Sequence, residues 1–387
     1  MDKRFVKTKI LFVLPIQSPY LTERLKKLAS YSDIEIVLLL ESAELANRPG
    51  WRPQPIPGVV VEVWQSLILS NHRMYPDLGY EIKGMRSVPW RLPLALWRHR
   101  PSVVVVCNAT QLLFSLPLKP FLGYKIYLTV EDTPHSIRNK STIVKFFKTF
   151  VYRQADLFLA YSEMATEFLS KIVAQNRVRR TSWSVDLKWF KPDQKIKDDF
   201  KEKLGVSDQV IFLFAGALIP GKGVMPLLRG WAKLTSAERN KSILLVAGTG
   251  SQELEAKAYV ELHSMKEINF LGHLSYSDMR AAFIGCDIFV LPTLQDLFSL
   301  VVLEAMACGC PVLTTPYNGA SELIEKGETG WLFDVANEES ICDALRQAIK
   351  HRNELVYMEE KARERVSEMD NDIVMRKLAE ILQESVK

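Results

Sequence analysis

The stretch CDIFVLPTLQDLFSLVVLEAMACGCPVLTT (residues 286–315) shows the pattern on which the rest of the chain is built. Its first apolar run ends at Pro292 and predicts a strand buried on both faces, and a second such strand begins at Pro311. Between them, residues 300–307 form an apolar run that predicts a buried helix, and Gly309 is typical of the residue that follows a helix. Buried strands that alternate with helices indicate a parallel sheet covered on both faces.

Two series of such strands follow one another along the chain. The predicted strands are 10–16, 34–40, 59–64, 102–107, 125–130 and 157–162 in the first series, and 210–216, 242–248, 268–272, 287–292 and 311–315 in the second. We therefore predict an α/β protein with two doubly wound, Rossmann-like domains at 1–190 and 191–370, followed by a C-terminal helix at 371–387. Ligands bind at the carboxyl ends of such sheets and between domains, so we expect a cleft with one substrate on each domain.

The composition is that of an ordinary globular protein. Among 387 residues, 48% are hydrophobic and 25% are charged, which excludes a disordered, collagen-like or coiled-coil chain. Five scattered cysteines give neither a disulfide framework nor a zinc spacing, so we expect reduced thiols and a cytoplasmic protein. The longest apolar runs are about seven residues against the ~20 that span a membrane, and the basic amino terminus lacks a signal-peptide cleavage site.

The charge is unevenly distributed. Residues 1–190 hold 27 Lys and Arg against 15 Asp and Glu, whereas the remainder holds 23 against 30. A basic half indicates an acidic partner, namely an anionic membrane, a phospholipid-linked substrate or nucleic acid, unless it is only a solvated surface. The stretches 89–100 and 143–153 mix basic and aromatic residues. Each fits either an anionic membrane surface or a helix that packs on the sheet with a basic outer face.

Two acidic residues stand out in the quoted stretch. Asp296 lies in the predicted loop and Glu304 lies inside the apolar helix, where a carboxylate is costly unless it is paired or hydrogen-bonded. Two ribose hydroxyls would satisfy Glu304, and the helix-start amides near Phe298, Ser299 and Leu300 favour a phosphate. The alternatives are that Asp296 only caps the helix and that Glu304 pairs with a basic residue elsewhere.

This arrangement resembles a known family. Asp296, the seven residues LFSLVVL, Glu304 and then AMACGCPV are similar to the signature of the family-4 retaining glycosyltransferases of the GT-B fold, the glycosyl transferases group 1. The similarity continues in order and spacing through 185–192, 212–231, 244–258, 268–283 and 318–333. It covers about residues 150–350, whereas residues 1–150 match only in architecture. It implies two Rossmann-like domains that face each other across a cleft, with a C-terminal helix that crosses back to the N-terminal domain.

The resemblance also implies roles in binding a nucleotide-sugar. Glu304 would hold the ribose, Asp296 would contact the transferred sugar, and Lys222 would neutralise the β-phosphate unless it is a solvated loop lysine. The remaining implied donor contacts are the amides of Phe298, Ser299 and Leu300 at the sugar and diphosphate, Gly216 where the chain approaches the phosphates, and Gly272, His273 and Leu274 beside the base.

The N-terminal domain offers acceptor-side candidates. The predicted strand 125–130 ends in the loop EDTPHSIRNK, in which Glu131 and Asp132 take the places where relatives often carry His and Asp. Either Glu131 or His135 is a candidate to contact the acceptor hydroxyl or the sugar. The alternative is a loop that is capped by its own Asp and His side chains.

Three features depart from the family pattern. The first acid is Asp296 where Glu is usual, so its carboxylate is one methylene shorter, and Ala217 stands where a basic residue is common. The loop PIQSPYLTE (15–23) lacks the usual glycine pair after the first strand, which puts the N-terminal contact to the donor in question.

These observations lead to one functional expectation. We expect a retaining, metal-independent hexosyltransferase without cofactor that moves a sugar from a UDP-sugar, or less favourably GDP-mannose, to a glycan or lipid-linked glycan. We place it in cell-surface polysaccharide synthesis, at the inner face of the membrane, with no nucleic-acid partner. The triplet Asp370-Asn371-Asp372 imitates a metal motif but is expected to cap the last helix, and no GxGxxG fingerprint supports a dehydrogenase. The alternatives are a nucleotide-sugar epimerase of the same shape and a non-catalytic nucleotide-sugar binding protein.

Overall fold

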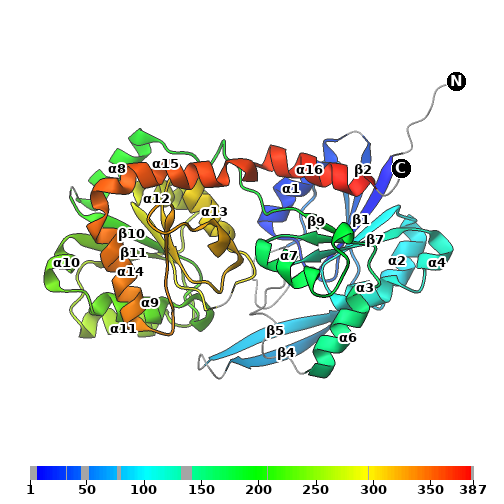
Figure 1. Cartoon of the computed structure of the whole chain (residues 1–387), viewed down its shortest axis with the longest axis horizontal. Coiled ribbons are helices and arrows are strands. Elements are labelled where there is room, and N and C mark those ends of the chain that lie inside the picture. Colours follow the sequence, from blue (N-terminus) through cyan, green and yellow to red (C-terminus); the bar gives the residue numbers. More distant parts are fainter. Residues whose placement is uncertain are drawn as a thin grey trace. The chain divides into compact units, whose positions relative to one another are not determined.

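The computed structural model describes residues 7–31, 33–44, 52–75, 80–131, 142–206, 208–294 and 296–384. The chain separates into two compact units, each of which is a sheet covered by helices (Figure 1). The first unit contains residues up to Tyr75, Glu81–Trp183 and the C-terminal segment from Asn371, and the second contains Ser184–Asp370. None of the helices that the structure describes is both long and apolar enough to cross a membrane.

The first unit is built on a seven-stranded parallel sheet in the order β3-β2-β1-β6-β7-β8-β9. The strands are β1 (Thr8–Leu14), β2 (Ile34–Leu40), β3 (Val59–Val63), β6 (Val103–Val106), β7 (Lys125–Val130), β8 (Leu157–Ala160) and β9 (Val178–Arg180). Successive side chains of a strand point to opposite faces, so Leu11 and Val13 enter one core and Ile10 and Phe12 enter the other. The apolar runs that form β1, β2, β6, β7 and β8 are therefore strands buried largely on both faces, as predicted. The edge strand β3 is the exception, because its Val60 and Val63 side chains are exposed.

Helices cover both faces of this sheet. The helices are α1 (Pro19–Ala29), α2 (Leu92–His99), α3 (Ala109–Ser115), α4 (Lys119–Leu122), α6 (Thr142–Tyr152), α7 (Glu163–Ser170), the short 3-10 turn η2 (Gln175–Arg177) and α16 (Asn371–Glu384). Buried side chains of α2, α3, α6 and α7 share one core, and those of α1 and α16 share the other. Helix α16 packs against α1, and the Lys27 ammonium pairs with Asp372 at 2.6 Å. The expected return of the last helix to the first unit is confirmed.

A two-stranded sheet in the first unit was not foreseen from the sequence. It consists of β4 (Leu67–Tyr75) and β5 (Tyr80–Val88), which pair with each other. Neither LILSNHRMY nor YEIKGMRSV is a continuous apolar run, which is the signal that identifies strands buried on both faces. A two-stranded ribbon does not have to be buried on both faces, so its strands need no such run.

The second unit repeats the plan with a six-stranded parallel sheet in the order β12-β11-β10-β13-β14-β15. The strands are β10 (Val210–Ala215), β11 (Ser242–Ala247), β12 (Ile268–Gly272), β13 (Ile288–Leu291), β14 (Val312–Thr314) and β15 (Gly330–Leu332). The order reverses between β10 and β13, and the loops that leave these two strands meet at this switch point. Ligands of doubly wound sheets bind at such a point.

The helices of the second unit also form two layers. They are α8 (Gln194–Leu204), α9 (Val224–Ala232), α10 (Ser236–Asn240), α11 (Glu253–Leu262), α12 (Tyr276–Gly285), α13 (Leu300–Ala307), α14 (Glu338–Lys350) and α15 (Leu355–Val366), with 3-10 turns η3 (Pro220–Lys222), η4 (Gly319–Leu323), η5 (Arg352–Glu354) and η6 (Ser367–Met369). Helix α9 packs against α11 and α14, whereas α12 packs against α8 and α13, and α13 also contacts α15. All five cysteines are free thiols, as expected.

Candidate functional site

The loops after β10 and β13 are joined backbone to backbone. The Leu294 amide and the Thr293 hydroxyl both donate to the Gly221 carbonyl, at 3.0 and 3.1 Å. Gly223 has a φ of +76°, and a Cβ atom there would lie 1.9 Å from the Pro292 carbonyl oxygen. Glycine is therefore required where the two loops approach each other. This contact fixes the position of Lys222, which lies between the two joined glycines.

The Asp296 carboxylate accepts hydrogen bonds from a lysine and from a serine near these loops. Its Oδ2 atom accepts a hydrogen bond from the Lys222 ammonium at 2.5 Å and another from the Ser299 hydroxyl at 2.6 Å. Its amide donates to the Tyr317 carbonyl at 3.0 Å, which ties the loop to the segment after β14. Lys222 and Asp296 both keep part of their side chains exposed. The structure thus brings together two predicted site residues, and Lys222 is an ion-pair partner rather than a solvated loop lysine.

Helix α13 begins beside this ion pair without a side-chain cap. Its N-cap residue is Ser299, not Asp296, and the Ser299 hydroxyl bonds to Asp296 instead of the helix amides. The Ser299 amide donates to the side-chain oxygen of the fully buried Asn318 at 3.1 Å, so this amide is already occupied. Of the three predicted amides, those of Phe298 and Leu300 remain as candidates. An uncapped helix start with a neighbouring lysine favours an anion.

Glu304 is buried in helix α13. Its side chain is 6% exposed, and in the parts of the chain that the structure describes no hydrogen bond or ion pair reaches its carboxylate. Burial raises the pKa of Glu304 to about 8, because desolvation disfavours the charged form. The alternative in which a lysine or arginine neutralises it is not seen among these residues. A partner from outside the protein, with hydroxyl donors, would satisfy it.

The carboxyl ends of β10, β11 and β12 are tied side by side. The Gly216 amide donates to the Ala247 carbonyl at 3.0 Å, and the Gly248 amide donates to the Gly272 carbonyl at 2.7 Å. Gly248 has a φ of +132°, and a Cβ atom there would lie 1.9 Å from the Gly216 oxygen. Gly216 itself has room for a Cβ, whose nearest neighbour would be Phe214 at 3.7 Å. The sequence reasoning therefore missed Gly248, although the triplet GTG at 248–250 carried the signal.

The three residues expected beside the base lie after β12. Gly272 adopts a φ of +67° with open space around its Cβ position, His273 is exposed and Leu274 is half-buried. Ser275, the next residue, caps α12 by accepting the Asp278 amide at 3.1 Å. The backbone turn is thus held in place while its outer side stays accessible.

The carboxyl edge of the sheet in the first unit is acidic. Glu131 follows β7 and is half-buried, while His135 lies outside the described residues. Glu41, directly after β2, is 3% exposed and accepts a hydrogen bond from the Ser87 hydroxyl at 2.6 Å. Burial raises the pKa of Glu41, and burial with the charges of Glu41 and Glu131 raises the pKa of Cys107 to about 12. The sequence analysis did not identify Glu41, because an acidic residue at the end of an apolar run is the only sign of it in the sequence.

The loop after β1 is held by its own side chains. Ser18 caps α1 by accepting the Leu21 amide at 3.3 Å, and the Gln17 side-chain oxygen accepts the Gln54 amide at 2.9 Å. The Gln17 amide group in turn donates to the Thr22 hydroxyl at 2.9 Å. This loop therefore keeps its shape without the glycine pair that the family pattern has at this place.

The Asp370-Asn371-Asp372 triplet has structural partners. Asp370 forms a bridge with Val185, helix α16 starts at Asn371, and Asp372 pairs with Lys27. Within the described ranges, no group of three or more His, Cys, Asp and Glu side chains is arranged to hold a metal ion.

The sequence is similar to those of known glycosyltransferases. Residues 196–365 match the family described as Glycosyl transferases group 1. An uncharacterised glycosyltransferase of Methanocaldococcus jannaschii is 30% identical over 174 residues, which cover 44% of this chain and 42% of that protein. The N-acetyl-alpha-D-glucosaminyl L-malate synthase of Bacillus anthracis is 28% identical over 252 residues, or 63% of each chain. The chain thus spans less than two thirds of the length of these relatives.

The fold agrees with solved structures over almost the whole chain. The HepE protein of Anabaena, crystallised with UDP and glucose, superposes with a TM-score of 0.72 at 16% identity and covers 97% of this chain and 100% of its own. Agreement at this level of identity reports the fold of both units. Residues 196–365 are therefore similar to the glycosyl transferases group 1 family, and the chain as a whole has the GT-B fold.

Proposed function

We propose that the protein is a family-4 retaining glycosyltransferase that transfers a sugar from a nucleotide diphosphate sugar to a glycan or lipid-linked glycan. The observation that carries this proposal is Glu304, a buried carboxylate for which the described residues provide no hydrogen-bond or ion-pair partner, on the helix whose uncapped start lies beside Lys222. A buried carboxylate is stabilised by hydrogen-bond donors, and the two hydroxyls of a ribose provide such a pair. Residues 191–370 would be the donor-binding domain and residues 1–190 the acceptor-binding domain.

The donor would bind along the switch point of the second unit. Glu304 would accept hydrogen bonds from the ribose hydroxyls, and the free amides at the start of α13 would contact the diphosphate. The Lys222 ammonium would then be shared between Asp296 and the β-phosphate, where negative charge grows as the sugar leaves. Because this cation comes from the protein, the proposal requires no metal ion. Asp296 would contact the transferred sugar, with Gly272, His273 and Leu274 near the base.

The reaction would proceed on one face of the sugar. The bond between the anomeric carbon and the β-phosphate oxygen breaks while the acceptor oxygen bonds to the same carbon from the same side. The departing diphosphate oxygen takes the proton of the acceptor hydroxyl, and Lys222 stabilises the charge that remains. Glu131 and His135 are the proposed contacts of the first unit to the acceptor or the sugar.

For the donor we propose a UDP-sugar in preference to GDP-mannose. HepE, a protein of the same fold, was crystallised with UDP and glucose, which supports a UDP-sugar without extending its specificity to this chain. We also propose that the enzyme works in the cytoplasm at the inner face of a membrane, in the synthesis of a cell-surface polysaccharide. The basic first unit supports an acceptor carried by an anionic lipid.

Thermal-shift measurements with UDP, UDP-glucose and GDP-mannose test the donor site. A donor at a hundred times its Kd should stabilise the protein by about 2.7 kcal/mol. Glu304→Ala should weaken donor binding by about 100-fold or more, because hydrogen bonds to a charged group contribute ~1.5–3 kcal/mol each. The matched control is Glu261→Gln, an exposed carboxylate on α11. Unchanged donor binding by Glu304→Ala would refute the site.

Two further assays separate transfer from the alternatives. An epimerase would convert the donor without an acceptor, and a binding protein would release no UDP at all. A transferase should release UDP only when acceptor is present. Retention is tested by NMR of the product, whose anomeric configuration should equal that of the donor.

A further inference from the structure

Helix α6 of the first unit exposes an apolar face. Ile143, Phe146, Phe147 and Phe150 are 81%, 75%, 56% and 59% exposed. Their spacing of i, i+3, i+4 and i+7 places all four on one side of the helix. Buried Val151 and Tyr152 anchor the helix in the core. These four side chains give α6 an apolar outer face, which favours the first of the two alternatives for residues 143–153, because large exposed apolar patches mark interaction surfaces.

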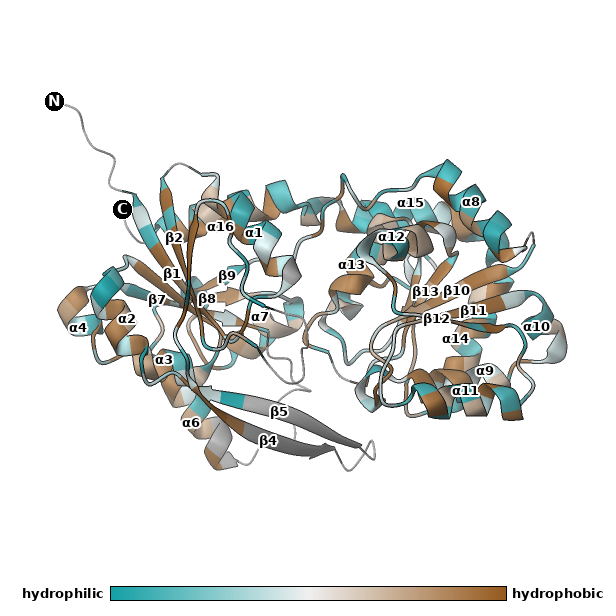
Figure 2. Cartoon of the chain, turned by 180° about the vertical axis from the view of Figure 1, so that it is seen from behind, coloured by the Kyte–Doolittle hydropathy of each residue, from teal (hydrophilic) through white to brown (hydrophobic). Residues whose placement is uncertain are grey.

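More exposed aromatic residues lie on the same helical layer. Trp90, Leu94 and Trp97 around α2, and Phe121 on α4, are each more than half exposed. Helix α3 packs against both α2 and α6, so these elements cover one face of the sheet, and Figure 2 shows hydrophobic colouring along α2, α4 and α6. We call the four exposed residues of α6 together with these four residues the docking face.

The charge of this region is strongly positive. Residues 89–155 contain ten Lys and Arg against two Asp and Glu. The guanidinium of Arg91 lies 4.8 Å from the ring centre of Trp90, and that of Arg100 lies 5.3 Å from the ring centre of Trp97. Aromatic rings with cations beside them suit the interfacial layer of a bilayer, where the ring enters the acyl boundary and the cation meets a phosphate.

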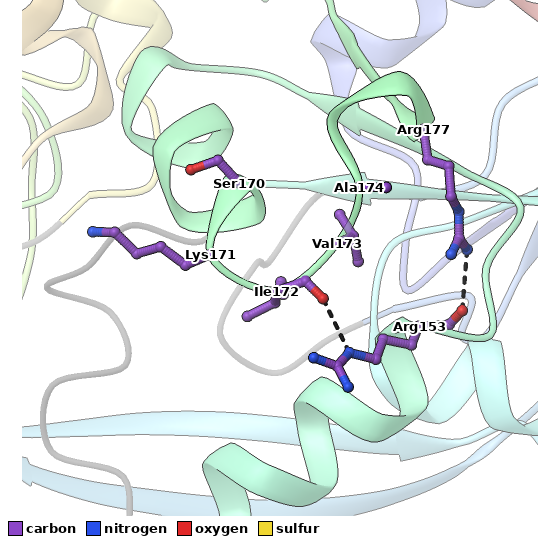
Figure 3. A pocket seen from close by; sticks show the side chains of 7 residues that line it. All are labelled: Arg153, Ser170, Lys171, Ile172, Val173, Ala174 and Arg177. Carbon is purple, nitrogen blue, oxygen red and sulfur yellow. Dashed lines mark hydrogen bonds between the residues drawn. The ribbon is translucent and has the colours of Figure 1, made fainter.

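A basic pocket opens beside the C-terminal end of α6. It has a volume of about 400 Å³ and is lined by Arg153, Ser170, Lys171, Ile172, Val173, Ala174 and Arg177 (Figure 3). The Arg153 Nε donates to the Ile172 carbonyl at 3.0 Å, and Arg177 donates to the Arg153 carbonyl at 3.0 Å. These bonds hold two guanidinium groups at the pocket. Lys171 also lines it, and its ammonium pairs with the exposed Glu167 carboxylate at 2.7 Å. The pocket suits the phosphate of a lipid headgroup.

We propose that the docking face binds the surface of an anionic phospholipid bilayer, with the α6 side chains in the interfacial layer and a headgroup phosphate in the basic pocket. The positive charge favours this occupant over a second copy of the chain, which would bring an equally basic face. The inference specifies the membrane attachment suggested in the proposed function, but it does not depend on catalysis. Binding can therefore be measured without donor or acceptor.

Co-sedimentation with vesicles of phosphatidylcholine, with and without phosphatidylglycerol, tests the proposal. The wild type should pellet with phosphatidylglycerol vesicles, and less of it should pellet as salt is raised. The double variant Phe146→Asp/Phe150→Asp should bind at least about tenfold more weakly, because two aromatic side chains lose their burial. The matched control is Leu254→Asp, which changes an exposed apolar side chain on α11 of the second unit in the same way and should bind vesicles like the wild type. The Trp90 and Trp97 fluorescence should shift to the blue on binding.

Further variants separate the possible outcomes. Lys171→Gln should reduce the preference for phosphatidylglycerol while leaving the melting temperature unchanged. Equal pelleting of the double variant and the wild type, or pelleting that ignores phosphatidylglycerol, would overturn the proposal. So would a wild-type dimer in light scattering that the double variant abolishes, because the face would then bind a second copy. If wild-type vesicle binding holds but nucleotide-sugars give no thermal shift, the proposed function fails and the docking face stands.

Discussion

The two units share one plan, yet the carboxyl edges of their sheets carry opposite chemistry. In the second unit a lysine, an uncapped helix start and a buried carboxylate without a partner among the described residues lie at the switch point. In the first unit, the corresponding edge gathers Glu41, Glu131 and the un-ionised thiol of Cys107. The first half is the basic one in total charge, and ten of its 27 Lys and Arg fall in residues 89–155, the range that contains α2 and α6. Net charge therefore does not identify the edge that suits a diphosphate.

Among the variants that test the difference between the two sheet edges, Lys222→Gln should have the largest effect. Lys222→Gln removes the cation from the diphosphate edge and leaves Asp296 with only the Ser299 hydroxyl among the partners described above. We expect kcat to fall by about 100-fold or more, as when an oriented stabilising group is lost from a transition state. Steady-state kinetics with saturating donor measure this, and Lys257→Gln on α11 is the control. A fall in melting temperature alone, with kcat preserved, would contradict the assigned role.

Two glycines at the carboxyl edge of the second unit's sheet should differ sharply in how far a substitution by alanine destabilises the protein. Gly248→Ala places a Cβ against the Gly216 oxygen at a φ of +132°, so we expect a loss of unfolding free energy above about 2 kcal/mol. Gly216→Ala meets only ordinary contacts and should cost less than about 1 kcal/mol. Urea denaturation of both variants checks the difference, and equal losses would show that the two strand ends are not packed as described.

The pH dependence of stability should report the buried Glu304. Its folded pKa of about 8 lies above the ordinary value of 4.5, so the unfolded chain releases a proton in this range and the folded chain does not. Stability of the ligand-free protein should therefore fall by up to ~1.4 kcal/mol per pH unit between these values, as far as this group is concerned. Glu304→Gln should remove that contribution in denaturant titrations at several pH values. An identical slope in the variant would mean that Glu304 is already ionised.

The substitution Glu41→Gln should have the smallest effect, namely none on donor binding. Glu41→Gln replaces a buried acid of raised pKa in the first unit with a neutral side chain of the same size. Donor-induced thermal shifts should stay within experimental error of the wild type, because the diphosphate is proposed to bind the other edge. A clear loss of donor binding would mean that the acidic edge takes part in donor recognition after all.

The sequence predicted those features that depend only on residues close to one another in the chain. Apolar runs identified six of the seven strands of the first sheet and five of the six strands of the second, because a strand buried on both faces needs no polar alternation. The edge strands β9 and β15 were missed, because their three residues, VRR and GWL, do not form such a run. The spacing from Asp296 to Glu304 indicated a loop and a helix with an acid in each. The hairpin of β4 and β5 was missed because its strands lack such runs. Glu41 was missed because a single acid after a strand does not tell which other groups come near it.

The sequence by itself determined the α/β alternation, the acid pair and the basic, aromatic character of 89–153, since these depend on residue type and short spacing. Only the tertiary structure decided that Lys222 pairs with Asp296, 74 positions away, that Asn318 occupies the Ser299 amide, and that Phe146 and its neighbours on α6 face outward. The reason is that partners and exposure are set by which segments the sheet order brings together. That order comes from the packing of the whole unit and is not encoded in any one stretch.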